Sequence, residues 1–319
     1  MKPKVMIAYQ SFGDLEVEKN VLSRIDAEIN HVGDLTSPAA LEAVKQADAV
    51  MVTLQKVTGE IINTMQNCRV ISRAGTGLDT IDIDTATAKG IWVAYVPDYS
   101  IDEVSAHAIA LLMVQARGIV PLVQTTRAGK WDNMASGPVY RLKDQTLGVV
   151  GFGRIGQATA EKGRGLGLKV IVHDPYANQA VVDKMGVRVV DLETLARESD
   201  YISLHAPLID STKHIVNAQF LAWMKPTAYL INAARGPLID EDALLQAVRA
   251  KQIAGAAIDV LAVEPIDPNN PLLREERILI TPHSAWYSEE AKIDLRTRCA
   301  EEVVRVLSGE KPRSPVNQV

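Results

Sequence analysis

Three side chains that could carry acid–base chemistry each follow an apolar run in the second half of this 319-residue chain. Arg235 follows AYLINAA, Glu264 follows AAIDVLAV, and His283 follows ILITP. If these runs are parallel strands, the three side chains lie at one edge of a sheet, because the carboxyl ends of parallel strands meet there. We therefore expect them to converge on one site.

The three residue types suit proton transfer on a small acid. A histidine exchanges a proton near neutral pH, and a neighbouring carboxylate favours its protonated form. A guanidinium binds a carboxylate through two parallel hydrogen bonds. Together they fit hydride transfer by a cofactor with proton exchange at the substrate oxygen. Taken singly, His283 also fits a structural loop histidine, Glu264 a solvated residue before Pro265, and Arg235 a surface ion pair.

A glycine pattern earlier in the chain predicts a dinucleotide site. Residues 151–156 fit G-x-G-x-x-G, between an apolar run at 147–150 and a helical run at 157–164. The first glycine permits a tight turn, the second admits a pyrophosphate, and the third allows a helix to pack closely on a strand. The helix N-terminus then offers amide groups to the phosphates. The residues expected to bind the cofactor here are Gly151, Gly153, Arg154, Ile155 and Gly156.

An acidic residue at the end of the next apolar run predicts which dinucleotide binds. Asp174 closes KVIVHD and lies 18 residues after Gly156, close to the roughly 20 expected for the carboxylate that binds the adenosine ribose hydroxyls. A carboxylate there repels a 2′-phosphate, so the sequence favours NAD(H) over NADP(H). The other interpretation of Asp174 is a turn residue before Pro175.

Composition argues against several other classes of protein. Lys and Arg number 34 against 39 Asp and Glu, for a net charge of −5, which disfavours a nucleic-acid partner. No apolar run approaches the ~18 residues of a membrane helix, and the apolar run in MKPKVMIAY is too short for a signal peptide. Cys68 and Cys299 lack metal-site spacing, so we expect two buried free thiols, no metal and a cytoplasmic protein.

The elements that must position these residues follow from the hydrophobic pattern. Apolar, β-branched runs alternate with helical ones, which predicts an α/β protein with parallel sheets. Strands are expected at 4–9, 48–53, 69–72, 91–96, 147–150, 169–174, 201–205 and 278–281. Helices are expected at 38–45, 81–90, 102–118 and 288–307. We expect a loose polar segment at 124–145 and a solvated tail at 309–319.

The position of the glycine pattern predicts a discontinuous domain. The length suggests two domains, but elements from 102 to 281 belong with the sheet that contains Gly151. We therefore predict a Rossmann-type, doubly wound NAD-binding domain at 101–287. Residues 1–100 and 288–319 are predicted to form a smaller, flavodoxin-like α/β substrate domain.

Seven segments spread over nearly the whole chain resemble one known family. They are SRAGTGLDTIDID (72–84), LGVVGFGRIGQ (147–157), VHDPY (172–176), LHAPL (204–208), INAARGPLIDEDAL (231–244), GAAIDVLAVEP (255–265) and TPHSAW (281–286). The chain is similar there to the D-isomer-specific 2-hydroxyacid dehydrogenases, particularly in N-x-A-R-G, D-V-x-x-x-E-P and P-H. Related formate dehydrogenases usually have Gln at the Glu264 position, so the resemblance to that branch is disfavoured. Longer phosphoglycerate dehydrogenases carry a regulatory domain, for which we expect no room before Val319.

The resemblance implies roles for the three candidate residues and their surroundings. Arg235 would bind the carboxylate and carbonyl of the substrate, His283 would be the general acid/base, and Glu264 its carboxylate partner. Further cofactor contacts are implied for His205 and Pro207 on the adenosine side, Asp259 at the nicotinamide carboxamide, and Ala233. Backbone amides of one loop would grip the substrate carboxylate; its residues are Ala74, Gly75, Thr76 and Gly77.

Within the family, TPHSAWYSEEA, VYRLKDQTLG and VHDPY are most similar to the branch that contains the C-terminal binding protein corepressors. In that branch the residue at the Trp286 position lies against the substrate; plain packing is the other interpretation of Trp286. The family often has Val-Ala-Glu-His where this chain has Val104-Ser105-Ala106-His107, which bears on a domain or subunit contact.

Two functions follow as hypotheses. The first is an NAD-dependent dehydrogenase that interconverts a small 2-oxo acid and the D-2-hydroxy acid. The alternative is an NAD(H)-responsive, corepressor-like binding protein with a vestigial site. The resemblance also implies a homodimer with its contact within 102–145, and we expect no nucleic-acid or membrane partner.

Overall fold

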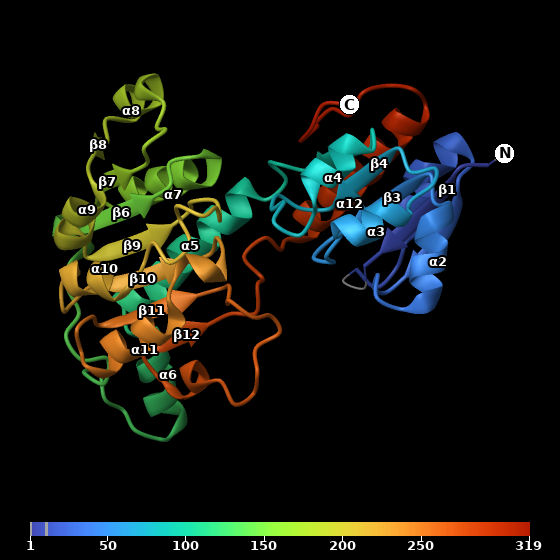
Figure 1. Cartoon of the computed structure of the whole chain (residues 1–319). Helices are drawn as coiled ribbons and strands as arrows, with labels where there is room; N and C mark the ends of the chain where they lie inside the picture. Colours follow the sequence, from blue (N-terminus) through green and yellow to red (C-terminus); the bar gives the residue numbers. More distant parts are fainter. Residues whose placement is uncertain (1, 10–11) are drawn as a thin grey trace. The chain divides into compact units, whose positions relative to one another are not determined.

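The computed structural model of the chain describes residues 2–9 and 12–319, which fall into two compact units (Figure 1). The first unit comprises residues 1–99 and 288–319, and the second comprises residues 100–287. These boundaries lie within one residue of those expected from the sequence. In the described part of the chain no single helix could cross a membrane; one bent helix pair, Ile101–Ala116 with Ile119–Arg127, meets the length and composition requirements across a 61° bend.

A five-stranded parallel sheet of order β2-β1-β3-β4-β5 organises the first unit. This is the flavodoxin-like order 2-1-3-4-5. Its strands are β1 (Lys4–Ala8), β2 (Glu28–Val32), β3 (Ala49–Val52), β4 (Val70–Arg73) and β5 (Trp92–Tyr95). Its helices are α1 (Glu16–Leu22), η1 (Ser23–Ile25), α2 (Pro38–Gln46), α3 (Gly59–Thr64), α4 (Ile83–Ala88) and α12 (Glu289–Leu307).

Helices cover both faces of this sheet, as a parallel sheet of apolar strands requires. Met6, Val50 and Ile71 face one core cluster, which also contains side chains of α2, α3 and α4. The C-terminal helix α12 packs against α1 and against β3, β4 and β5. Ser72 Oγ of β4 donates to the Cys299 carbonyl of α12 at 2.8 Å. Helix α12 is therefore part of the first unit.

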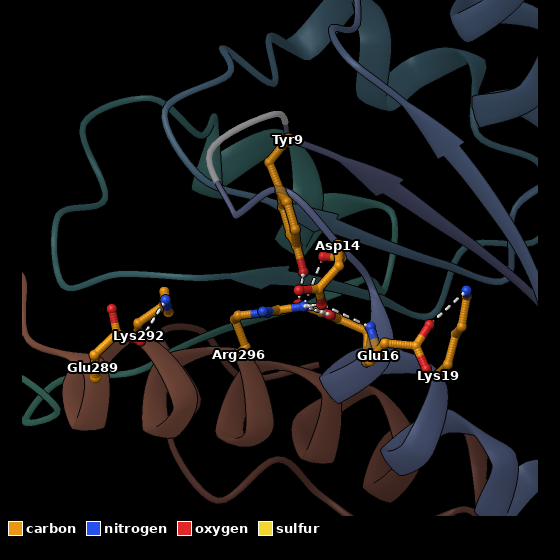
Figure 2. A network of polar contacts seen from close by, with 8 residues as sticks. Tyr9, Asp14, Glu16, Lys19, Glu289, Lys292 and Arg296 are labelled. Carbon is orange, nitrogen blue, oxygen red and sulfur yellow. Dashed lines mark hydrogen bonds and ion pairs between the residues drawn. The ribbon is translucent and has the colours of Figure 1, made fainter.

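A buried ionic network fastens α12 to the N-terminal part of the same unit (Figure 2). Arg296 donates to both carboxylate oxygens of Glu18, at 2.8 and 2.7 Å, and to Asp14 Oδ1 at 2.9 Å. The Tyr9 hydroxyl donates to Glu18 at 2.6 Å. Arg296 and Glu18 are only 2% and 0% exposed. The hydrogen bonds with Glu18 raise the pKa of Arg296, which keeps the guanidinium charged although it is buried.

A seven-stranded parallel sheet of order β12-β11-β10-β9-β6-β7-β8 organises the second unit. Counted within the unit, this is the doubly wound order 3-2-1-4-5-6 with one more strand at the edge. Its strands are β6 (Thr146–Val150), β7 (Lys169–His173), β8 (Arg188–Val189), β9 (Tyr201–Leu204), β10 (Tyr229–Asn232), β11 (Gly255–Ile258) and β12 (Ile278–Ile280). Its helices are α5 (Ile101–Ala116), α6 (Ile119–Arg127), η2 (Leu142–Asp144), α7 (Arg154–Gly165), α8 (Gln179–Met185), α9 (Leu192–Glu198), α10 (Ala218–Trp223), η3 (Gly236–Leu238), α11 (Glu241–Arg249) and η4 (Pro271–Arg274).

Successive strand residues in this sheet serve two different cores. Leu230 and Ala256 belong to a cluster with α9, α10 and α11, whereas their neighbours Ile231 and Ala257 belong to a cluster with α5, α7 and α8. The alternation follows from the two-residue period of a strand. Because both faces are covered, ligands can reach the sheet only at its edges and ends.

The structure corrects four local expectations. The helix predicted at 102–118 is α5, but the segment 124–145 that was predicted to be loose begins inside a second helix, α6, which follows Gly118 with its left-handed φ of +56°. The run 256–263 is a strand only to Ile258. The tail predicted to be solvated instead pairs with β5: the Val316 amide donates to the Val93 carbonyl at 2.8 Å, and Asn317 is 8% exposed. The pattern also missed β2, an edge strand with polar residues and no apolar run.

Candidate active site

The three predicted catalytic residues follow three adjacent strands of the second unit. Arg235 comes three residues after β10, His283 three residues after β12, and Glu264 six residues after β11. Glu264 is thus not directly at a strand end, but its loop returns to the same edge of the sheet. The predicted convergence is therefore visible in the structure.

His283 and Glu264 form a directly hydrogen-bonded pair. His283 Nδ1 lies 2.6 Å from Glu264 Oε2, and the two side chains are 30% and 29% exposed. An ionised carboxylate only accepts, so Nδ1 carries the proton in this contact. The other ring nitrogen, Nε2, is left as the atom that can exchange a proton with a substrate. Both groups remain accessible from solvent.

Opposing effects act on the Glu264 carboxyl. Its partial burial works to raise the pKa, but the hydrogen bonds from His283 and the Leu261 amide, with the charges of His283 and Arg235, together lower the pKa of Glu264 below its ordinary value. The Leu261 amide donates to Glu264 Oε1 at 2.8 Å. At neutral pH Glu264 is therefore an anion, as a partner for a protonated imidazole must be.

Two residues that the sequence predictions did not include hold the Arg235 loop. The fully buried Asn232 donates through Nδ2 to the Arg235 carbonyl at 2.9 Å and accepts from the Ala234 amide at 3.0 Å. A Cβ at Gly236 would lie 2.0 Å from the Leu261 carbonyl carbon. Gly236 thus lets the loop of Arg235 pack directly on the loop of Glu264. The signal for both was in the motif N-x-A-R-G, of which only Arg235 and Ala233 were singled out.

Asp259 organises the loop that carries His283. Its side chain is completely buried, and Oδ1 accepts from Thr281 Oγ1 at 2.5 Å and from the Ser284 amide at 3.0 Å. Oδ2 accepts from the Ala285 amide at 2.9 Å, and the Asp259 carbonyl accepts from the His283 amide at 2.8 Å. The observed role of Asp259 is thus to position this loop; its contact with a nicotinamide carboxamide stays a prediction.

The glycine pattern has the geometry that a pyrophosphate site requires. Gly151 has a φ of +91°, and a Cβ there would lie 2.5 Å from the Ala206 nitrogen. A Cβ at Gly156 would lie 2.1 Å from the Gly151 carbonyl oxygen, so α7 can approach β6 only with glycine there. Gly153, by contrast, faces open space. It precedes α7, whose first turn holds Arg154 and Ile155 and contains no acidic residue.

The adenosine side of the predicted cofactor site is formed after β7 and β9. Asp174 Oδ2 accepts from the Phe152 amide of the glycine loop at 2.7 Å, and Oδ1 accepts from the Tyr176 amide at 2.8 Å. His205 is half-buried, and its burial lowers its pKa to about 4, so the ring is neutral at pH 7. Pro207 is exposed beside it. These residues flank the point between β6 and β9 where the strand order reverses, the usual dinucleotide position.

Two further predicted contacts lie near the same edge. Ala233 follows β10 and is 9% exposed. Trp286 is half-buried and packs against the core cluster that contains side chains of α5. Its ring contacts the Tyr287 ring edge to face, with 5.6 Å between the ring centroids. Packing is thus an observed role of Trp286, and its contact with substrate stays a prediction.

The predicted carboxylate-binding loop follows β4 in the first unit. Gly75 has a φ of +145°, and the Arg73 guanidinium occupies the position that a Cβ would take. The Ala74 and Gly75 amides donate to the Val52 and Arg73 carbonyls at 2.7 and 3.0 Å. The binding of a substrate carboxylate by amides of Ala74, Gly75, Thr76 and Gly77 stays a prediction.

Among residues 2–9 and 12–319, no group of three or more His, Cys, Asp or Glu side chains could hold a metal ion. Both cysteines, Cys68 and Cys299, are free and buried, as predicted.

The doubly wound sheet and the glycine loop define a dinucleotide-binding protein as the class of protein. Comparison with known families makes this specific: residues 109–285 match the family described as D-isomer specific 2-hydroxyacid dehydrogenase, NAD binding domain. The chain belongs to the D-isomer-specific 2-hydroxyacid dehydrogenase family, and NAD(H) is its cofactor.

Relatives in sequence and structure agree with this assignment. The chain is 35% identical over its full length to a glyoxylate reductase of Korarchaeum cryptofilum, of which it covers 97%. It is 38% identical to a D-3-phosphoglycerate dehydrogenase of Methanocaldococcus jannaschii over 91% of this chain, but it spans only 55% of that relative. The fold is similar to a D-lactate dehydrogenase of Aquifex aeolicus complexed with NAD and lactic acid, with a TM-score of 0.88, 27% identity and 96% of each chain covered.

Proposed function

We propose that this chain is an NAD-dependent dehydrogenase that interconverts a small 2-oxo acid and the corresponding D-2-hydroxy acid, with His283 as the general acid/base. The observation that carries the proposal is the 2.6 Å contact between His283 and an ionised Glu264. Reduction of a carbonyl needs a proton at the oxygen, and a protonated histidine beside a carboxylate supplies one near neutral pH. In the oxidative direction the same nitrogen takes the proton back.

The division of work among the chain's residues follows from their geometry. Arg235 offers a planar donor pair that binds a carboxylate and orients the neighbouring carbonyl. His283 Nε2 donates the proton while Nδ1 stays bonded to Glu264, which stabilises the imidazolium. When bound, NADH supplies the hydride. Gly153, the first turn of α7, and Asp174 would hold the cofactor, because they offer an open approach, phosphate-binding amides and a ribose acceptor.

The substrate is proposed only as a class. The relatives are named glyoxylate reductase, D-lactate dehydrogenase and D-3-phosphoglycerate dehydrogenase, and these substrates share a carboxylate next to a carbonyl or hydroxyl carbon. That is the group that Arg235 would bind. We propose that the first unit acts as the substrate domain and that amides of its loop at 74–77 bind a carboxylate.

The corepressor-like alternative rests only on the resemblance of TPHSAWYSEEA, and no structural observation favours it. Arg235, Glu264 and His283 are all present, and the last two are paired, whereas a vestigial site has no need of the pair. A place in the corepressor branch and a cytoplasmic location stay predictions.

We also propose that a second copy of the chain covers an apolar surface on the second unit. Six large apolar side chains are exposed within residues 119–140 and would contribute to it: Ile119, Val123, Trp131, Met134, Val139 and Tyr140. Trp131 is 95% exposed and Met134 is 73% exposed. Patches of this kind mark interaction sites, and this one lies inside the segment 102–145 where the family resemblance implies the dimer contact.

The function is tested by following NADH oxidation with 2-oxo acids of graded size and charge, from glyoxylate to phosphorylated and aromatic acids. We expect turnover with at least one small acid and a loss of about 10²–10⁴-fold in kcat for His283→Ala. NADH binding to that variant, measured by fluorescence, should be unchanged. If the wild type binds NADH but reduces none of the acids, or if His283→Ala retains full turnover, the proposal is wrong.

A further inference from the structure

His107 of α5 contacts the loop that carries His283. Its Nε2 lies 3.1 Å from Thr281 Oγ1 and 3.5 Å from Asp259 Oδ1. Helix α5 packs against β10 and β11, so these contacts join a core helix to the catalytic edge of the sheet. The imidazole is mostly buried, with 25% of its side chain exposed.

The hydrogen-bond geometry determines which atoms donate. Asp259 is the acceptor, because its two oxygens also accept from the Ser284 and Ala285 amides. The single hydroxyl proton of Thr281 therefore points to Asp259 Oδ1, 2.5 Å away. Thr281 Oγ1 can then only accept from His107, so Nε2 of His107 carries a proton. A directed chain results, from His107 through Thr281 to Asp259.

This chain of hydrogen bonds ends at a strained segment of backbone. His283 has a φ of +53°, a left-handed conformation that is rare for a non-glycine residue. Such a conformation persists only where its surroundings hold it. Asp259 does so through its carbonyl, which accepts from the His283 amide at 2.8 Å, and through the carboxylate bonds to residues 284 and 285.

We infer that His107 is a positioning residue for His283: it orients the Thr281 hydroxyl toward Asp259, which in turn clamps the backbone of residues 283–285. The inference rests on the proposed function, in which His283 transfers the proton. The chain requires a donor at the His107 position and not a positive charge. A neutral donor of similar reach should therefore substitute for the imidazole.

Two variants and one matched control test this role. His107→Phe keeps a ring but removes the donor, and His107→Gln returns a neutral donor. Gln115→Leu is the control, because Gln115 lies on the same helix but donates to the Ala256 carbonyl of β11, at 2.7 Å, and not to the loop at 281–285. For each protein we would measure kcat, KM for the 2-oxo acid, NADH affinity and amide hydrogen exchange of residues 283–285.

We expect His107→Phe to lower kcat about tenfold or more, because small misplacements of a catalytic group have large effects, with KM and NADH affinity within about twofold of wild type. Amide exchange at 283–285 should accelerate in the same variant. His107→Gln should recover most of kcat and of the protection, and Gln115→Leu should change neither.

The role is overturned if His107→Phe keeps wild-type kcat and exchange, if His107→Gln is as impaired as His107→Phe, or if Gln115→Leu loses as much kcat. Amide exchange does not depend on turnover. Accelerated exchange in His107→Phe but not in Gln115→Leu would therefore support the clamp even if the wild type reduced no 2-oxo acid, a result that would refute only the proposed function.

Discussion

The His283–Glu264 contact divides the imidazole into two nitrogens with different tasks. Nδ1 is committed to Glu264, and the reactive proton is confined to Nε2. The same carboxylate is held by the Leu261 amide, so the ring orientation depends on backbone that packs on Gly236. At the scale of single residues, the hydrogen-bond partners of each side chain thus determine which of its atoms can exchange a proton with a substrate.

Glu264→Gln tests this division. The amide keeps the size of the side chain but removes the counter-charge of a protonated His283. In the reductive direction we expect kcat/KM to fall about tenfold or more, because the imidazole that donates the proton loses its carboxylate partner. NADH affinity serves as the control. A kcat/KM equal to that of the wild type would contradict the assigned role of Glu264.

His205 predicts a pH dependence of stability. Burial lowers its pKa to about 4 in the folded state, whereas an unfolded histidine takes up a proton near pH 6.5. The unfolded state therefore binds more protons between these values, and stability is lost as the pH falls through this window. From pH 7 to pH 5 the wild type should lose about 2 kcal/mol more than His205→Gln.

Urea unfolding of both proteins at pH 7 and pH 5 measures this difference. Glutamine can still bond to the Ser203 hydroxyl, which lies 2.8 Å from His205 Nε2, so the two proteins should differ little at pH 7. If the difference between them is the same at both pH values, His205 is not held neutral by the fold.

At the scale of elements, α12 returns from the end of the chain to the first unit, and a buried ion pair anchors it there (Figure 2). Arg296 is 2% exposed and Glu18 is 0% exposed. A buried pair need not add net stability, but removal of one partner leaves the other charge uncompensated. The cation also lies over the Phe12 ring at 5.5 Å. Removal of one of the two charges should therefore lower the free energy of unfolding more than removal of both.

Arg296→Met should destabilise the protein by about 3–5 kcal/mol, because Glu18 would remain buried without a cation. The double variant Arg296→Met with Glu18→Leu should recover a large part of that loss. Chemical denaturation of wild type, both single variants and the double variant completes the cycle. Equal losses in Arg296→Met and in the double variant would show that the pairing of charges is not what anchors α12.

At the scale of the whole molecule, the exposed apolar surface at 119–140 predicts the assembly state. We expect the wild type to sediment as a dimer at micromolar concentration. Trp131→Ser combined with Met134→Ser should shift it toward the monomer, because two large apolar contacts are lost. Leu54→Ser is the control, since Leu54 is 55% exposed in the first unit. A monomeric wild type, or an equally dissociated Leu54→Ser, would refute the proposed interface.

The amino-acid pattern predicted most of the fold because buried parallel strands are short apolar runs that can be recognised locally. It failed where local signals were weak or misleading. Strand β2 lacks an apolar run, and α6 begins after the left-handed Gly118 in a segment with many polar residues. The polar C-terminal tail is ordered by hydrogen bonds to β5, which exist only once the rest of the first unit has folded.

The site divides in the same way between sequence and tertiary structure. Residue types and their positions after strands were enough to nominate Arg235, Glu264, His283, the glycine loop and Asp174, since the chemistry of each side chain is intrinsic to it. Which atoms meet was decided only by packing. Asp259 turned inward to clamp the His283 loop, Asn232 and Gly236 fastened Arg235 beside Glu264, and His107 came within reach of Thr281 from a distant helix. Contacts of this kind join residues far apart in the chain, so no local pattern encodes them.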